Sequence, residues 1–161
     1  MKKVRDDLSS KGVSVFFTPG KEIENLFLAP STIQHVIPKE HIKEFETRWD
    51  EVFKSERIEA YGSYVTLHQK FLSPKLDIKT VTTKFTPLFD KTWADKKTRH
   101  RIIEGKKALH HLRAFYREKA GSNLTTQKLI QAVVKGRDAE AKGIVGQALG
   151  CLRKKKQILH Y

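Results

Sequence analysis

Residues 19–30 read PGKEIENLFLAP, and this stretch marks the point where the pattern of the chain changes. Before it, the β-branched and aromatic run VSVFF (13–17) is typical of a buried strand, and a short helical pattern precedes that run. After Pro30 the apolar residues recur at helical spacing. The sequence therefore predicts a mainly α chain, with a short α/β remnant of one helix and one buried strand over residues 1–30 and a helical bundle over residues 31–161.

Four segments of the bundle carry apolar residues at the spacing of one helix face, namely residues 42–53, 108–116, 126–135 and 144–152. Gly121 is placed to end the second helix. Thr125 is placed to cap the third, with Leu124 and Leu129 at the spacing of a hydrophobic staple. Weaker helical patterns cover residues 57–72 and 80–93, and SPKLD (73–77) between them is typical of a loop.

A single strand leaves its own backbone N–H and C=O groups without partners, and no second run with strand character follows VSVFF. The partner strands must come from another subunit or from an upstream part of the same domain. We expect the second, so that the chain is the tail of a longer α/β domain. The exposed strand edge could instead pair with a second copy, which would make a homodimer.

The chain carries a formal net charge of +14, and nearly all of the excess lies in its second half. Residues 1–90 hold 14 Lys and Arg against 13 Asp and Glu, whereas residues 91–161 hold 18 against 5. A positive field of this size attracts polyanions, and nucleic acid is the commonest such partner. The alternatives are a solvated basic surface or a surface that docks an acidic protein.

Other compositional features exclude several classes of function. The single cysteine, Cys151, cannot form an intramolecular disulfide, and no histidine pair has the spacing of a helical zinc site. No phosphate-binding loop of the Walker type is present, so we expect no ATP site in this chain. No secretory leader and no run of roughly 18 apolar residues occurs. We expect a soluble, cytoplasmic protein without membrane contacts.

The acids of the opening stretch have two interpretations. Glu22 and Glu24 alternate with Ile23, so in an extended segment both side chains would point to the same side. Carboxylates at the C-terminal end of a buried α/β strand are well placed to hold Mg²⁺ or Mn²⁺. The alternative is that the acids cap the turn NLFL that follows and interact with its helix dipole.

A resemblance bears on this choice. KGVSVFFTPGKEIENLFLAP (11–30) is similar to the last strand of the Toprim domain in nucleases of the overcoming-lysogenization-defect (OLD) family and related defence effectors. It implies that Glu24 is a catalytic, metal-binding carboxylate, with Glu22 as a weaker neighbour. IIEGKKALHHL (102–112) resembles a later segment of that family, in which a lysine at the start of a helix reaches back to the active site. That lysine would be Lys106.

The resemblance implies metal-dependent phosphodiester hydrolysis in the complete protein, as part of phage defence. The earlier glutamate and Asp-x-Asp strands of a Toprim site appear in no suitable context, so we expect them upstream, together with an ATPase domain or subunit, and expect the isolated chain to be inactive. The helical part would bind DNA through Lys106, Lys107, Arg113, Arg153, Lys154, Lys155 and Lys156. The alternative hypotheses are a non-catalytic nucleic-acid-binding helical module and a protein-interaction domain that docks an acidic partner.

Overall fold

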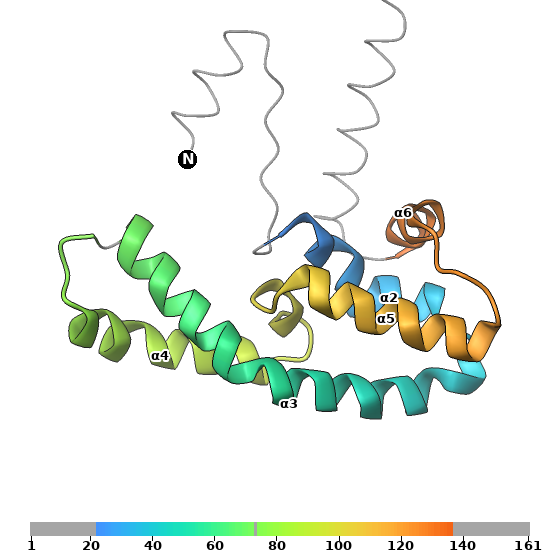
Figure 1. The fold of residues 1–161 in the computed structure, drawn as a ribbon, viewed down its shortest axis with the longest axis horizontal. Helices are drawn as coiled ribbons and strands as arrows, with labels where there is room; N and C mark the ends of the chain where they lie inside the picture. The colour runs from blue at the N-terminus through green and yellow to red at the C-terminus, as the bar shows by residue number, and fades with distance from the viewer. Residues whose placement is uncertain (1–21, 73, 137–161) are drawn as a thin grey trace, which may run out of the picture.

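The computed structural model describes residues 22–72 and 74–136, and every regular element within these ranges is helical (Figure 1). The prediction of a mainly α chain is confirmed for this part. The helix and strand predicted before residue 18, and the helix predicted over residues 144–152, lie outside the described residues. In chain order the elements are the 3₁₀-helix η1 (Ile23–Leu28), α2 (Pro30–Val36), the 3₁₀-helix η2 (Lys39–His41), α3 (Ile42–Leu67), the π-helical turn η3 (His68–Leu72), α4 (Ile78–Ala94), the 3₁₀-helix η4 (Arg99–Arg101), α5 (Gly105–Ala120) and α6 (Thr126–Lys135).

The longest helix, α3, continues well past the predicted segment 42–53. It runs to Leu67 and passes directly into η3, so the weaker pattern over residues 57–72 is also helical. A loop then leads to α4, where the N-cap carboxylate of Asp77 accepts a hydrogen bond from the backbone N–H of Thr80 (3.0 Å). Helices α3 and α4 contact each other and form a hairpin that extends from the rest of the molecule (Figure 1).

The ends of α5 and α6 follow the predicted signals. Gly121 ends α5 in the left-handed conformation, with φ of 62°, which glycine adopts without the steric cost of a Cβ atom. The Thr125 hydroxyl accepts a hydrogen bond from the backbone N–H of Lys128 (3.2 Å) and caps α6. Leu124 and Leu129 are both buried, as expected for a hydrophobic staple. All three predictions are confirmed.

Aromatic side chains of α3 and α5 form the centre of the core. Phe45 stacks on Trp49 and meets Phe115 edge to face, with ring centroids 5.1 Å apart in each pair. Leu112 of α5 belongs to the same cluster and is fully buried. These residues were predicted to face the core because they recur at helical spacing, and the structure confirms this.

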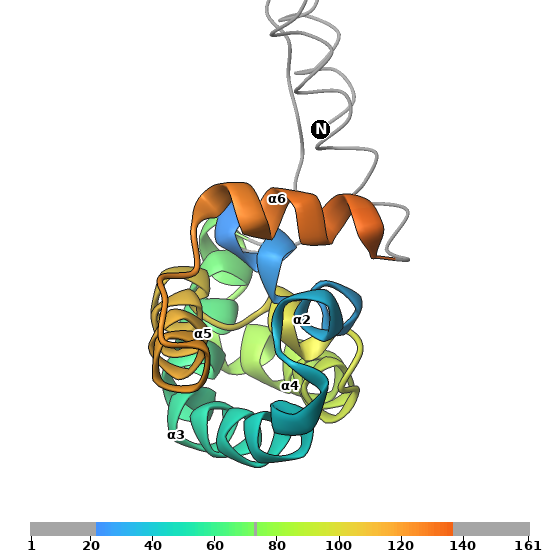
Figure 2. The ribbon, with the colours of Figure 1, turned by 90° about the vertical axis from the view of Figure 1, so that its right-hand side faces the viewer.

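Helix α6 lies across α2 and η1 (Figure 2). It meets η1 through a small buried cluster in which Leu26 packs on Val133. This packing attaches α6 to the segment that contains the candidate site residues of the opening stretch.

None of the helices in residues 22–72 and 74–136 combines the length and apolar character that crossing a lipid bilayer requires.

The position of Leu112 allows a direct test of the core. We expect Leu112→Ala to lower the free energy of unfolding by about 2–5 kcal/mol, because a fully buried leucine loses its contacts and leaves a cavity. Leu88→Ala on α4 is the matched control, since Leu88 is 49% exposed. The control should change stability by no more than about 0.5 kcal/mol. Equilibrium urea unfolding measures both, and equal effects of the two variants would contradict this assignment of the core.

Candidate functional site

The EIEN segment adopts a capped helical turn. Glu22 is extended, with φ of −135° and ψ of 160°, and η1 begins at the next residue. The backbone N–H of Glu22 donates a hydrogen bond to the Oδ1 atom of Asn25 (2.6 Å), and this bond closes the first turn. Of the two interpretations, the capped turn therefore agrees with the structure, and the extended segment from Glu22 to Glu24 does not. Glu22 alone is extended, whereas Glu24 lies in the first turn of η1.

Asn25 also connects η1 to a distant part of the chain. Its Nδ2 atom donates hydrogen bonds to the backbone carbonyl oxygens of His100 (2.6 Å) and Ile103 (3.2 Å). The residue is 2% exposed, so these bonds are shielded from water. With Oδ1 bound to Glu22, the side-chain amide uses both of its ends. Asn25 therefore fixes the opening stretch against the turn that precedes α5.

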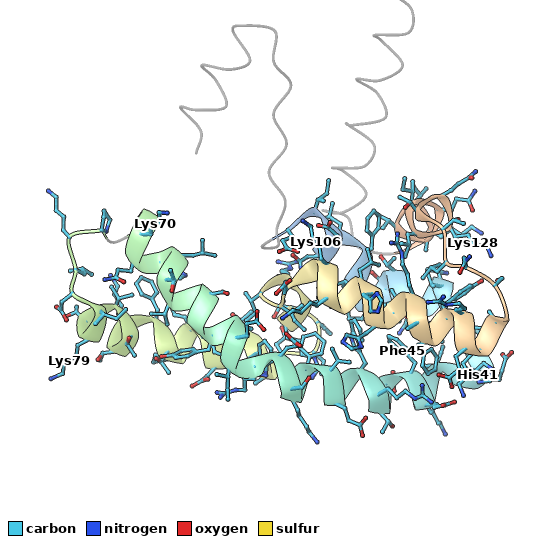
Figure 3. The ribbon with its side chains drawn as sticks, in the orientation of Figure 1. His41, Phe45, Lys70, Lys79, Lys106 and Lys128 are labelled. Atoms are coloured by element: carbon cyan, nitrogen blue, oxygen red, sulfur yellow. The ribbon has the colours of Figure 1, made fainter. Side chains whose placement is uncertain are left out.

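The start of α5 meets the EIEN segment directly. The backbone N–H of Lys106, in the first turn of α5, donates a hydrogen bond to the Oε2 atom of Glu22 (3.0 Å). Gly105 lies so close that a Cβ atom there would be 3.0 Å from Cβ of Glu24 and 3.2 Å from Cγ of Asn25. The structure thus joins the two segments on which the family resemblance rests, through residues Glu22 and Lys106 that lie 84 positions apart in the sequence. Figure 3 shows Lys106 beside η1.

The carboxylate of Glu22 has a structural role that the sequence interpretation did not foresee. It was expected either to bind metal or to cap the turn that follows it. It is the N-cap residue of η1 and shares a capping box with Asn25, so the capping interpretation agrees with the structure. The same carboxylate also accepts a backbone N–H at the start of α5, where the helix dipole favours a negative charge.

The described residues do not complete a metal site by themselves. No group of three His, Cys, Asp or Glu side chains that could hold a metal ion occurs in residues 22–72 and 74–136. One oxygen of Glu22 is bound to Lys106, and the amide of Asn25 is fully used. Glu24, half-buried beside Gly105, remains the candidate ligand. Any further carboxylates would have to come from outside the described ranges.

Lys107 faces α3 rather than the candidate site. Its Nζ atom lies 2.6 Å from a carboxylate oxygen of Glu59, 3.4 Å from one of Glu104 and 3.7 Å from one of Glu56. The hydrogen bond to Glu59 and the nearby negative charges raise the pKa of the Lys107 ammonium. An ammonium held by three carboxylates is poorly placed to neutralise phosphates. We therefore leave Lys107 out of the candidate nucleic-acid surface.

A line of basic side chains runs along α5 from Lys106. Lys106, His110, Arg113 and Arg117 follow one another at intervals of four, three and four residues, which places them within about 60° of arc on the helix. We call these four residues the α5 stripe. Three of them are exposed, and Arg113 is half-buried with its Nη2 atom 3.3 Å from Oγ1 of Thr126.

Sequence reasoning had identified Lys106 and Arg113 but missed Arg117, which the helical spacing could have revealed, and it interpreted His110 as a packing or surface residue. The acidic side chain near the end of α5 lies on another flank, where Glu118 pairs with Arg48 of α3 (2.7 Å). The α5 stripe is therefore separated from the ion pairs that join α5 to α3. Arg153, Lys154, Lys155 and Lys156, which were also predicted to bind DNA, lie outside the described residues.

Comparisons with protein-family models, with curated proteins and with solved structures gave no match to this chain. The resemblance to the OLD family therefore rests on the quoted segments alone. Functional inference for this chain depends on the contact between η1 and α5 and on the distribution of charge around it.

The close approach of Gly105 to η1 generates a prediction. Gly105→Ala should destabilise the protein, because the new methyl group would press on Glu24 and Asn25. Gly62→Ala is the matched control, since it also lies in a helix and its Cβ would have no neighbour within 4 Å. The control should gain roughly 0.5–1 kcal/mol from the higher helix propensity of alanine. Thermal unfolding of the two variants should shift in opposite directions; a stabilised Gly105→Ala variant would refute the close contact.

Proposed function

We propose that this chain is the C-terminal part of a metal-dependent Toprim-type DNA endonuclease, and that its helical part binds DNA. The observation that carries the proposal is the direct contact between the EIEN segment and the start of α5. The resemblance implies such a contact, because a lysine at a helix start is expected to reach back to the catalytic acids. Helical spacing alone gives no reason for these two segments to meet.

The contact supports different roles for the two residues. Glu24 would contribute one carboxylate to a cluster whose other members lie outside the described residues. Lys106 engages Glu22 through its backbone N–H, so its exposed side chain is available to a phosphate. An ammonium beside the scissile phosphate would stabilise the charge that develops in the transition state. Mg²⁺ or Mn²⁺, if bound in the complete protein, would supply the Lewis acid.

The α5 stripe supports the DNA-binding part of the proposal. It begins at Lys106, the residue assigned to the reacting phosphate, and continues along the helix for about three turns. Lysine and arginine side chains that contact the phosphates of a nucleic-acid strand neutralise them and release counterions. A strand that follows the α5 stripe would therefore bring one of its phosphates to the contact between η1 and α5.

The second candidate function is a non-catalytic nucleic-acid-binding helical module. The cap that Glu22 provides to α5 favours it, because this contact has a purely structural explanation. The hydrogen bonds of Asn25 have one as well. A third candidate, a domain that docks an acidic protein partner, shares the basic surface. Only the nuclease requires Glu24 and Lys106 to act on a phosphate, so these two residues separate the candidates.

The decisive experiment uses the longest polypeptide that the gene encodes, with Mg²⁺ or Mn²⁺ and a DNA duplex. Glu24→Ala should abolish cleavage, because the variant lacks a carboxylate that would hold the metal. Its affinity for DNA should stay within about twofold of the wild type, because no positively charged side chain is removed. Lys106→Ala should slow cleavage by a factor on the order of 10²–10³, since a charge-stabilising group is removed. Its backbone N–H, and hence the bond to Glu22, would remain.

Lys79→Ala is the matched control, because Lys79 is also the second residue of a helix and is exposed, but lies on α4 at the far end of the hairpin (Figure 3). It should cut DNA at the wild-type rate. If Glu24→Ala and Lys106→Ala cut as fast as this control, the nuclease proposal fails. Wild-type binding without cleavage by any of the proteins would favour the non-catalytic module.

A further inference from the structure

A small pocket between α2 and α6 contains only basic and neutral side chains. Its volume is about 120 Å³, and its polar lining comes from His35 of α2, Tyr116 of α5, and Lys128, Gln131 and Lys135 of α6. Lys128 and Lys135 are seven residues apart, so they lie on the same side of α6, two turns from each other. Two larger pockets among the described residues differ, because one contains Glu46 and Asp50 and the other Glu51 and Glu118.

The buried Tyr116 positions one of these cations. The Nζ atom of Lys128 donates a hydrogen bond to the Tyr116 hydroxyl oxygen (3.2 Å), and the ammonium also lies 5.3 Å from the centre of the ring. This hydrogen bond lowers the pKa of the Tyr116 hydroxyl. Because the oxygen accepts from Lys128, its own hydrogen can be donated elsewhere. The pocket therefore combines an oriented ammonium with a hydroxyl donor, which is a donor set suited to an anionic oxygen.

The pocket and the candidate site lie along the same helix, α5. Figure 3 shows Lys106 at the start of α5 and Lys128 between α6 and the second half of α5, where it contacts Tyr116. Helix α6 is fixed to η1 by the contact of Leu26 with Val133, so the pocket and the EIEN segment belong to one packed unit. Arg113 of the α5 stripe reaches α6 at Thr126 (3.3 Å). Cations thus continue from the α5 stripe to the pocket.

We propose that the α2–α6 pocket binds a backbone phosphate of a nucleic-acid strand, with Lys128, Lys135 and the Tyr116 hydroxyl as its main ligands. The proposal rests on the DNA-binding part of the proposed function and does not require cleavage. A nucleic-acid phosphodiester fits better than an acidic side chain, because the pocket is small and offers several donors to one anion. The α5 stripe supplies further cations for the neighbouring phosphates.

Fluorescence anisotropy with a labelled DNA duplex, at several salt concentrations and without divalent metal, tests the proposal. The Lys128→Ala/Lys135→Ala double variant should reduce the slope of log affinity against log salt by about 0.9, because the pocket would no longer neutralise its one phosphate. The matched control is Lys43→Ala/Lys54→Ala, which removes two exposed lysines of α3 and the same net charge. The control should keep the wild-type slope. Tyr116→Phe should weaken binding several-fold while circular dichroism confirms that it is folded.

Three results would contradict the proposal, and each would overturn a different part of it. Equal slopes for the two double variants would overturn the pocket assignment and leave the nuclease proposal untouched. A wild-type chain that binds no duplex even at low salt would overturn both the pocket and the DNA-binding part of the proposed function. Competition by polyglutamate as strong as that by an oligonucleotide of equal charge would overturn the phosphate assignment and favour an acidic protein partner.

Discussion

The side-chain amide of Asn25 makes the hydrogen bonds on which the candidate site depends. It accepts the N–H of Glu22 and donates to the carbonyl oxygens of His100 and Ile103, all within a shielded environment. Loss of this amide would leave its hydrogen-bond partners unpaired, and each buried polar group without a partner lowers the free energy of unfolding by about 1–3 kcal/mol. Through these bonds, η1 is set against the start of α5, and Gly105 permits the close approach.

The packing of α5 decides which of its basic side chains form ion pairs and which remain available to a ligand. One flank faces α3, where Lys107 and Glu118 join ion pairs with acids and bases of that helix. The flank that bears the α5 stripe turns away from these pairs and toward α6. Among the described residues, the basic side chains of α5 are thus divided between those that pair with acids of α3 and those that do not. The proposed nucleic-acid surface is built from the second group.

Much of the helical architecture could be predicted from the sequence, because spacing and caps are local signals. The core face of α3, the stop at Gly121 and the staple of Leu124 with Leu129 are examples. The sequence left EIEN open between an extended segment and a capped turn, because the hydrogen bonds that fix the capped turn run from Asn25 to residues about 75 positions away.

The pocket residues His35, Lys128 and Lys135 were missed for a similar reason. They lie on two different helices that only tertiary packing brings together, and no local pattern joins them. Lys106 and Lys107 are neighbours in the sequence, yet only the first faces η1. That difference follows from how α5 is rotated about its own axis relative to η1 and α3. The sequence can indicate which residue contacts which element only after these neighbours are known.

The most direct test of this account is the free energy of unfolding of Asn25→Asp at pH 7, compared with Asn123→Asp in the exposed loop before α6. The two variants make the same change of charge. At residue 25, however, the carboxylate keeps the acceptor for Glu22 and loses the donor to both carbonyl oxygens. We expect Asn25→Asp to lower the free energy of unfolding by at least about 2 kcal/mol, whereas Asn123→Asp should change it by no more than about 0.5 kcal/mol. Identical urea midpoints for the two variants and the wild type would contradict it.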